Sequence, residues 1–162
     1  MIVIVIVGVV YTLAVTKLQS VGEKKVQPSL AHLKEYLLSL NTEAQSVRLL
    51  CLDDCSHCDV YADGNKIRTL DGFIDDTIES YAFEYLQGAV QKNESAFFNE
   101  ENVQESVCFS FRVARNGVSD QKIVLYKERA YDYTNYFEPT VVYDSLEEAV
   151  AAKENLNQEV TQ

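Results

Sequence analysis

Cysteine is the residue type in this chain whose number and spacing are best suited to chemistry. Three cysteines form a Cys-x3-Cys-x2-Cys pattern and a fourth follows much later, so that the set is Cys51, Cys55, Cys58 and Cys108. Cysteine thiolates bind zinc, ligate iron–sulfur clusters or oxidise to disulfides. An even number of cysteines in an exported domain usually indicates disulfides, so all four are candidate disulfide residues.

Two kinds of metal site are alternatives to disulfides. Zinc would be bound by Cys51, Cys55, Cys58 or His57 together with Cys108, because thiolates and imidazole are both zinc ligands. The Cys-x3-Cys-x2-Cys spacing is also the one that radical-SAM enzymes use to hold a [4Fe–4S] cluster. Those enzymes have barrel folds much larger than this chain allows, in which strands and helices alternate. This chain shows no such alternation. We therefore assign no metal ligand and expect no cofactor.

The favoured disulfide follows from the predicted strands. Cys51 ends one predicted strand and Cys108 begins another, so these two cysteines are expected to meet across a sheet. Cys55 and Cys58 lie in a loop and would pair with each other or stay free. Four cysteines allow three connectivities. A Cys55–Cys108 bridge is an alternative. It would change which cysteines are paired and would leave the prediction of an exported, disulfide-containing domain in place.

No other residues form a pattern typical of an active site. The two histidines, His32 and His57, accompany no nucleophile motif, and the sequence has no glycine-rich phosphate loop. A calcium site at an acidic loop lacks the EF-hand spacing. The sequence has three pairs of adjacent acidic residues, Asp53–Asp54, Asp75–Asp76 and Glu100–Glu101. Such pairs are more typical of a solvated face than of a catalytic acid–base pair. We expect a protein that is not an enzyme, with no catalytic residue.

The charge of the 162-residue chain is acidic and uneven. The formal net charge is −11; residues 1–50 carry 5 basic and 3 acidic groups, and residues 51–162 carry 9 and 22. A chain of this charge repels a phosphate backbone, so no nucleic-acid partner is expected. The length suggests one domain, or one domain with an appendage.

The first sixteen residues are uncharged and rich in Ile and Val. A helix that crosses a membrane needs about 20 apolar residues, so residues 1–17 are predicted to be a transmembrane helix that lacks a few residues at its N-terminus. A buried strand is the alternative, because Ile and Val favour β-structure. An unpaired apolar strand at a chain end would promote aggregation, which favours the helix.

The rest of the chain changes from a helical to a β pattern. Residues 18–41 are predicted to be a helical extension, because Leu30, Leu33, Leu37 and Leu40 share one helix face. Residues 42–162 are the predicted globular domain. Its expected elements are a strand at 46–52, a hairpin at 59–70, a strand at 80–86, a hairpin at 106–128, an edge strand within 130–143 and a helix at 145–160. Ser145 and Glu148 form a capping box at the start of that last helix.

The start of the chain resembles a known family. Its residues, Ile-Val-Ile-Val-Ile-Val-Gly-Val-Val-Tyr-Thr-Leu-Ala-Val, are similar to the N-terminal helix of type IV pilins and type II secretion pseudopilins. The resemblance implies an α+β fold in which a long N-terminal transmembrane and amphipathic helix packs on a small antiparallel sheet, with a C-terminal helix. The processing site of the family lies upstream of Met1, so no processing or assembly residue is transferred to this sequence.

The resemblance also implies a function. It is that of a structural subunit of a type II secretion pseudopilus or a type IV pilus-like filament, assembled through its apolar N-terminal helix. The implied location is the inner membrane, with a single membrane span and the globular domain in the periplasm. The implied partners are other pilin-like subunits, the secretion or pilus assembly machinery and the inner membrane. The alternative is a membrane-anchored periplasmic domain that binds a ligand or metal and does not polymerise.

Overall fold

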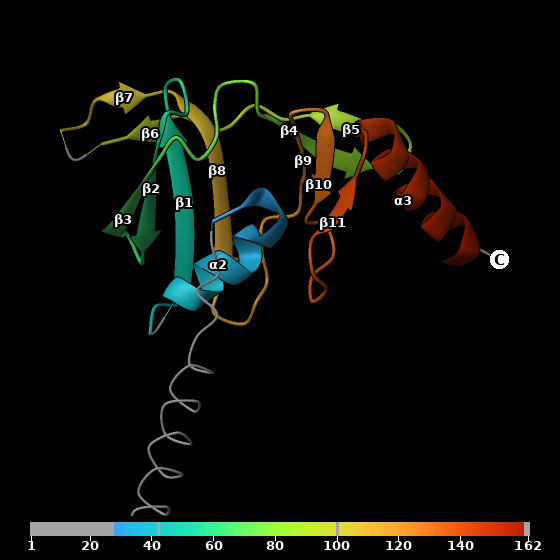
Figure 1. The fold of residues 1–162 in the computed structure, drawn as a ribbon, viewed down its shortest axis with the longest axis horizontal. Coiled ribbons are helices and arrows are strands. Elements are labelled where there is room, and N and C mark those ends of the chain that lie inside the picture. The colour runs from blue at the N-terminus through green and yellow to red at the C-terminus, as the bar shows by residue number, and fades with distance from the viewer. Residues whose placement is uncertain (1–27, 42, 100, 161–162) are drawn as a thin grey trace, which may run out of the picture.

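The computed structural model describes residues 28–41, 43–99 and 101–160, and antiparallel strands are its main regular structure (Figure 1). The helical elements are η1 (Leu30–His32), α2 (Leu33–Leu40) and α3 (Leu146–Val160). The strands are β1 (Ser46–Leu52), β2 (His57–Ala62), β3 (Asn65–Asp71), β4 (Glu79–Glu84), β5 (Gly88–Gln91), β6 (Phe97–Phe98), β7 (Gln104–Glu105), β8 (Val107–Ala114), β9 (Ile123–Tyr126), β10 (Arg129–Asp132) and β11 (Val141–Tyr143).

The first sheet has the strand order β3-β2-β1-β8 and is covered on one face by α2. Alternate residues of β1, β2 and β8 point to that face, where they are fully buried; they are Val47, Leu49, Cys51, Cys58, Val60, Phe109, Phe111 and Val113. Leu33 and Leu37 of α2 are also fully buried in this cluster. The predicted leucine face of the helix is therefore confirmed, and it forms one wall of the main hydrophobic core.

The second sheet has the order β11-β10-β9-β4-β5 and lies between the main core and α3. Val124 points to the main core, whereas Ile123 and Ala130 form a smaller apolar cluster with Ala149 of α3. Figure 1 shows α3 (red) at the outer end of the molecule, beyond this sheet. Each sheet therefore has its own short helix.

Several predicted elements are confirmed. The strand at 46–52 is β1, and the hairpin at 59–70 is β2–β3, whose two-residue turn at Asp63 and Gly64 has positive φ at both positions, as a type I′ turn requires. The C-terminal helix begins with Ser145, whose Oγ accepts a hydrogen bond from the Glu148 N–H at 3.2 Å. The edge strand within 130–143 is β11.

The hairpin predicted at 106–128 is wrong. The chain does turn at Gly117, which has φ +85°, but β8 belongs to the first sheet and β9 to the second. The Asp120 N–H donates to the Arg112 carbonyl at 3.0 Å, and Lys122 then binds Glu94 instead of continuing the pairing. The turn therefore directs the chain from one sheet to the other.

The predicted fold class is contradicted. Within the described residues the helix before the first strand runs only over residues 30–40, and it packs on one of two antiparallel sheets that make up most of the fold. The prediction failed because it assigned all the strands to one small sheet under one long helix. Residues 1–27, which include the predicted span at 1–17 and the first part of the extension at 18–41, lie outside the described residues.

The predicted location is contradicted as well. In the part of the chain that the structure describes, no helix has the length and apolar character needed to span a membrane. A single-pass inner-membrane location is therefore not retained. Leu33 and Leu37, in the described part of the predicted extension, belong to the same core as the strands.

Candidate functional site

The four cysteines form two disulfides at one end of the first sheet. Cys51 and Cys58 lie directly opposite each other on β1 and β2, and their sulfurs are 2.04 Å apart. Both residues are fully buried on the face covered by α2. This bridge closes the short loop at the end of the first hairpin.

The second disulfide joins that loop to the neighbouring strand. Cys55 lies in the β1–β2 turn with φ +62°, and its Cα is 5.6 Å from the Cα of Cys108 on β8. A bulge makes this approach possible, because the register of β1 against β8 shifts between Cys51 and Leu52 and leaves Cys108 without a direct partner on β1. The turn is thereby fixed to β8, so three consecutive neighbours in the sheet are linked covalently.

The favoured Cys51–Cys108 pairing is therefore wrong. The residue of β8 opposite Cys51 is Phe109, and the residue of β2 opposite Cys51 is Cys58. The spacing held a usable signal: Asp53 and Asp54 are strong turn formers, and a four-residue turn over 53–56 places residues 51 and 58 face to face. The alternative pairing of Cys55 with Cys108 is the one that the structure shows.

The disulfides also bear on the metal alternatives. All four sulfurs are engaged in S–S bonds, so no cysteine thiolate is left for zinc or an iron–sulfur cluster. His57 does not approach the cysteines; it lies on the exposed side of β2, where its Nε2 is 3.5 Å from the Asp71 carboxylate. Across the described residues, no group of three or more His, Cys, Asp or Glu side chains is arranged to hold a metal ion.

The remaining candidates from the sequence are dispersed over the surface. His32 is exposed, and Asp53 and Asp54 lie exposed in the β1–β2 turn. The carboxylate of Asp75 accepts hydrogen bonds from the Thr77 hydroxyl and backbone N–H, which lower its pKa. Asp76 and Glu101 are exposed, and Glu100 lies outside the described residues. The structure does not bring these groups together.

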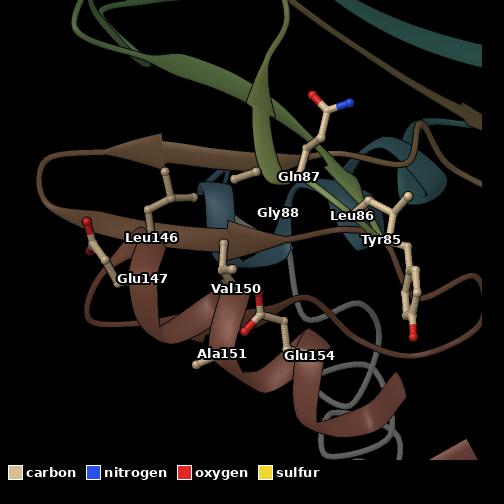
Figure 2. A pocket seen from close by; sticks show the side chains of 10 residues that line it. Tyr85, Leu86, Gln87, Gly88, Leu146, Glu147, Val150, Ala151 and Glu154 are labelled. Carbon is tan, nitrogen blue, oxygen red and sulfur yellow. The ribbon is translucent and has the colours of Figure 1, made fainter. Parts of the chain in front are cut away.

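A groove between α3 and the β4–β5 turn was not predicted from the sequence. It encloses about 490 Å³ and is lined on one side by Tyr85, Leu86 and Gly88, and on the other by Val150 and other residues of the helix. Figure 2 shows the two sides facing each other across the groove, with Glu154 at its rim. Leu86 is 90% exposed and Tyr85 67%, so the turn presents two large apolar side chains to solvent.

The surroundings of this groove are acidic. Glu147 and Glu154 of α3 line it. Beneath it, the Tyr81 hydroxyl donates a hydrogen bond to Glu79 at 2.6 Å. This bond, followed by partial burial and by the charges of Glu79 and Glu147, raises the pKa of Tyr81 to about 12. The groove therefore combines apolar contacts with negative charge.

A second apolar projection lies in the loop between β10 and β11. Phe137 is 83% exposed and Tyr136 53%. The loop is tied to α2 because the ammonium of Lys34 donates hydrogen bonds to the carbonyls of Tyr136, at 2.6 Å, and Glu138, at 3.3 Å. Only a weak sequence signal pointed to either projection, because their apolar residues occur where the strand patterns end.

The fold and these surfaces define a disulfide-linked antiparallel domain with two main sheets, a small β6–β7 pair and apolar side chains projecting from its turns. Comparisons of the chain with protein-family models, with curated proteins and with solved structures give no significant match.

Proposed function

We propose that this protein is a structural subunit of the pilin-like class, which works by assembling with other protein subunits outside the cytoplasm. The resemblance of residues 2–15 to pilins and pseudopilins suggests the class. The structural observation that supports it best is the pair of exposed apolar turns, at Tyr85–Leu86 and Tyr136–Phe137, on a domain held by two disulfides.

The disulfides support the location outside the cytoplasm. Thiols are kept reduced in the cytosol, and structural disulfides form in oxidising compartments. Three of the four cysteines are fully buried and Cys108 is half-buried, and the two bridges hold β1, β2 and β8 together. They have the character of structural bridges, which suits a subunit that must withstand extracytoplasmic conditions.

The exposed turns support assembly through protein contacts. Contiguous exposed apolar side chains on a folded domain commonly mark interaction surfaces, and tyrosine and phenylalanine are enriched in protein interfaces. Both turns are held in place, one beside α3 and the other by Lys34, so that they present their side chains in a fixed arrangement. Such surfaces favour association with other folded subunits.

The proposal predicts concentration-dependent assembly of the oxidised full chain. In sedimentation velocity, species larger than the monomer are expected to form, and Leu86→Glu or Phe137→Glu is expected to weaken assembly at least tenfold. The reason is that burial of one large apolar side chain contributes about 2 kcal/mol, which a charged side chain would forfeit.

The matched control is Ser95→Glu, which adds the same charge at an exposed polar position. It should assemble like the wild type. A full chain that stays monomeric at every concentration, or equal weakening by all three substitutions, would count against the proposal.

A further inference from the structure

Two arginines lie side by side on the face of the first sheet that points away from α2. Arg48 of β1 and Arg112 of β8 are direct partners in the strand register. Like charges directly opposite each other destabilise a strand pair. In a chain of net charge −11 with only 14 basic residues, this concentration of positive charge is unusual.

Neither arginine is well neutralised. None of the ion pairs among the described residues involves Arg48, whose neighbours across the strands are Arg112 and Tyr61. Arg112 has only Asp120, at 3.9 Å, and its side chain is 64% exposed. An ion pair this long and this exposed contributes little. The two guanidinium groups therefore keep most of their capacity to bind an anion.

The arginines line a pocket whose other walls are largely apolar. The pocket encloses about 290 Å³, and its walls include Leu50, Tyr61 and Phe97. Leu50 is only 2% exposed, although it points to the outer face of the sheet. The size is at the lower end of that seen for ligand sites and fits a group no larger than one amino-acid side chain.

The one carboxylate in this lining is already engaged. Asp63 accepts hydrogen bonds from the backbone N–H groups of Gln45 and Ser46, each at 3.0 Å. It therefore caps the start of β1 and does not pair with either arginine. The pocket retains a positive charge beside an apolar wall.

We propose that this pocket binds a carboxylate carried on an apolar group, such as an aromatic or branched aliphatic acid. The carboxylate would accept hydrogen bonds from Arg48 and Arg112, a charge-assisted arrangement that guanidinium groups favour. The apolar group would lie against Leu50, Tyr61 and Phe97. The ligand is either a free acid or the C-terminal residue of a peptide, which share this chemistry. The inference is independent of assembly through the exposed turns.

The test is a titration of the oxidised full chain, followed by NMR of backbone amides. 3-Phenylpropionate is expected to shift the amides around Arg48 and Arg112, whereas 3-phenylpropionamide and acetate, which lack the charge and the ring respectively, bind at least tenfold more weakly. Arg48→Gln and Arg112→Gln should each weaken binding of 3-phenylpropionate about tenfold or more, since a hydrogen bond to a charged group contributes 1.5–3 kcal/mol.

Arg129→Gln is the matched control, because Arg129 is an exposed arginine on β10 of the other sheet. This variant should bind like the wild type. Arg48→Gln should also leave the melting temperature unchanged or raise it, because it removes the repulsion between the two arginines. Lost binding in a folded Arg48→Gln variant therefore supports the proposal. Equal binding by wild type and Arg48→Gln, or equal loss in Arg129→Gln, overturns it.

Two peptides distinguish the sources of the ligand. A tetrapeptide ending in phenylalanine with a free carboxylate, compared with its amidated form, reports on a chain terminus. Binding of the free peptide at least as tightly as 3-phenylpropionate assigns the pocket to a polypeptide C-terminus. Binding of the small acid alone assigns it to a free acid. Failure of both to shift the amides near Arg48 contradicts the proposal, whether or not the chain assembles.

Discussion

Replacing Cys55 and Cys108 together by alanine is expected to lower the free energy of unfolding by about 4 kcal/mol. The two residues are 53 positions apart, and the chain-entropy model gives about this value for a loop of that length. Replacing Cys51 and Cys58, which are 7 positions apart, is expected to cost only about 2.5 kcal/mol. Alanine is chosen as the replacement because it is apolar and suits buried positions. Cys51, Cys55 and Cys58 are fully buried, and Cys108 is half-buried.

Urea denaturation without reductant measures both effects. The reduced wild-type chain is the control, and it should be less stable than either double variant. A Cys51/Cys58 variant that loses as much stability as the Cys55/Cys108 variant, or more, would show that loop closure does not dominate the contribution of these bridges.

The second large effect concerns the attachment of α3 to the second sheet. Lys153 of α3 forms an ion pair with Asp132 of β10 at 2.7 Å, with the two side chains 11% and 0% exposed. Lys153→Met would leave the Asp132 carboxylate buried without its cation, and breaking a buried pair in this way costs about 3–5 kcal/mol. Two hydrogen bonds from Thr134 still hold the carboxylate, so we expect about 3 kcal/mol.

The matched control is Lys66→Met. Lys66 pairs with Asp59 at the same distance of 2.7 Å, but its side chain is 52% exposed, and exposed pairs contribute at most about 1 kcal/mol. Hydrogen exchange should show loss of protection in α3 for Lys153→Met, and the added substitution Asp132→Asn should restore part of the stability. Equal effects of the Lys153 and Lys66 substitutions would contradict the role assigned to the buried pair.

Local structure was the part of the fold most open to prediction from sequence. The β1 strand, the turn at Asp63 and Gly64 and the Ser145 cap of α3 all follow from signals within a few residues, and all three are confirmed, although the Glu148 carboxylate accepts from the Asp144 N–H and not from Ser145. The face formed by Leu30, Leu33, Leu37 and Leu40 is also confirmed, with Leu40 only partly buried, because helical spacing determines which side chains are buried together.

Long-range pairing was much less predictable. The separation of β8 and β9 into different sheets depends on Asp120 and on the contact of Lys122 with the distant Glu94, which no local pattern indicates. The Cys55–Cys108 bridge depends on a one-residue bulge in β8, in which Cys108 is the extra residue. The groove beside α3 and the arginine pocket were missed for the same reason, since each is formed by segments far apart in the chain.

The most direct test of the central claim, that this chain works as an assembling subunit outside the cytoplasm, is photo-cross-linking in the cells that make it. Leu86, Phe137 and, as control, Ser95 are each replaced by benzoylphenylalanine in the full chain, and the adducts are identified by mass spectrometry. The proposal predicts that adducts at Leu86 or Phe137 join the chain to another copy or to a pilin-like subunit, with both disulfides formed, and that Ser95 gives none. Chains that remain monomeric at both positions, or that carry free thiols at Cys55 and Cys108, would contradict it.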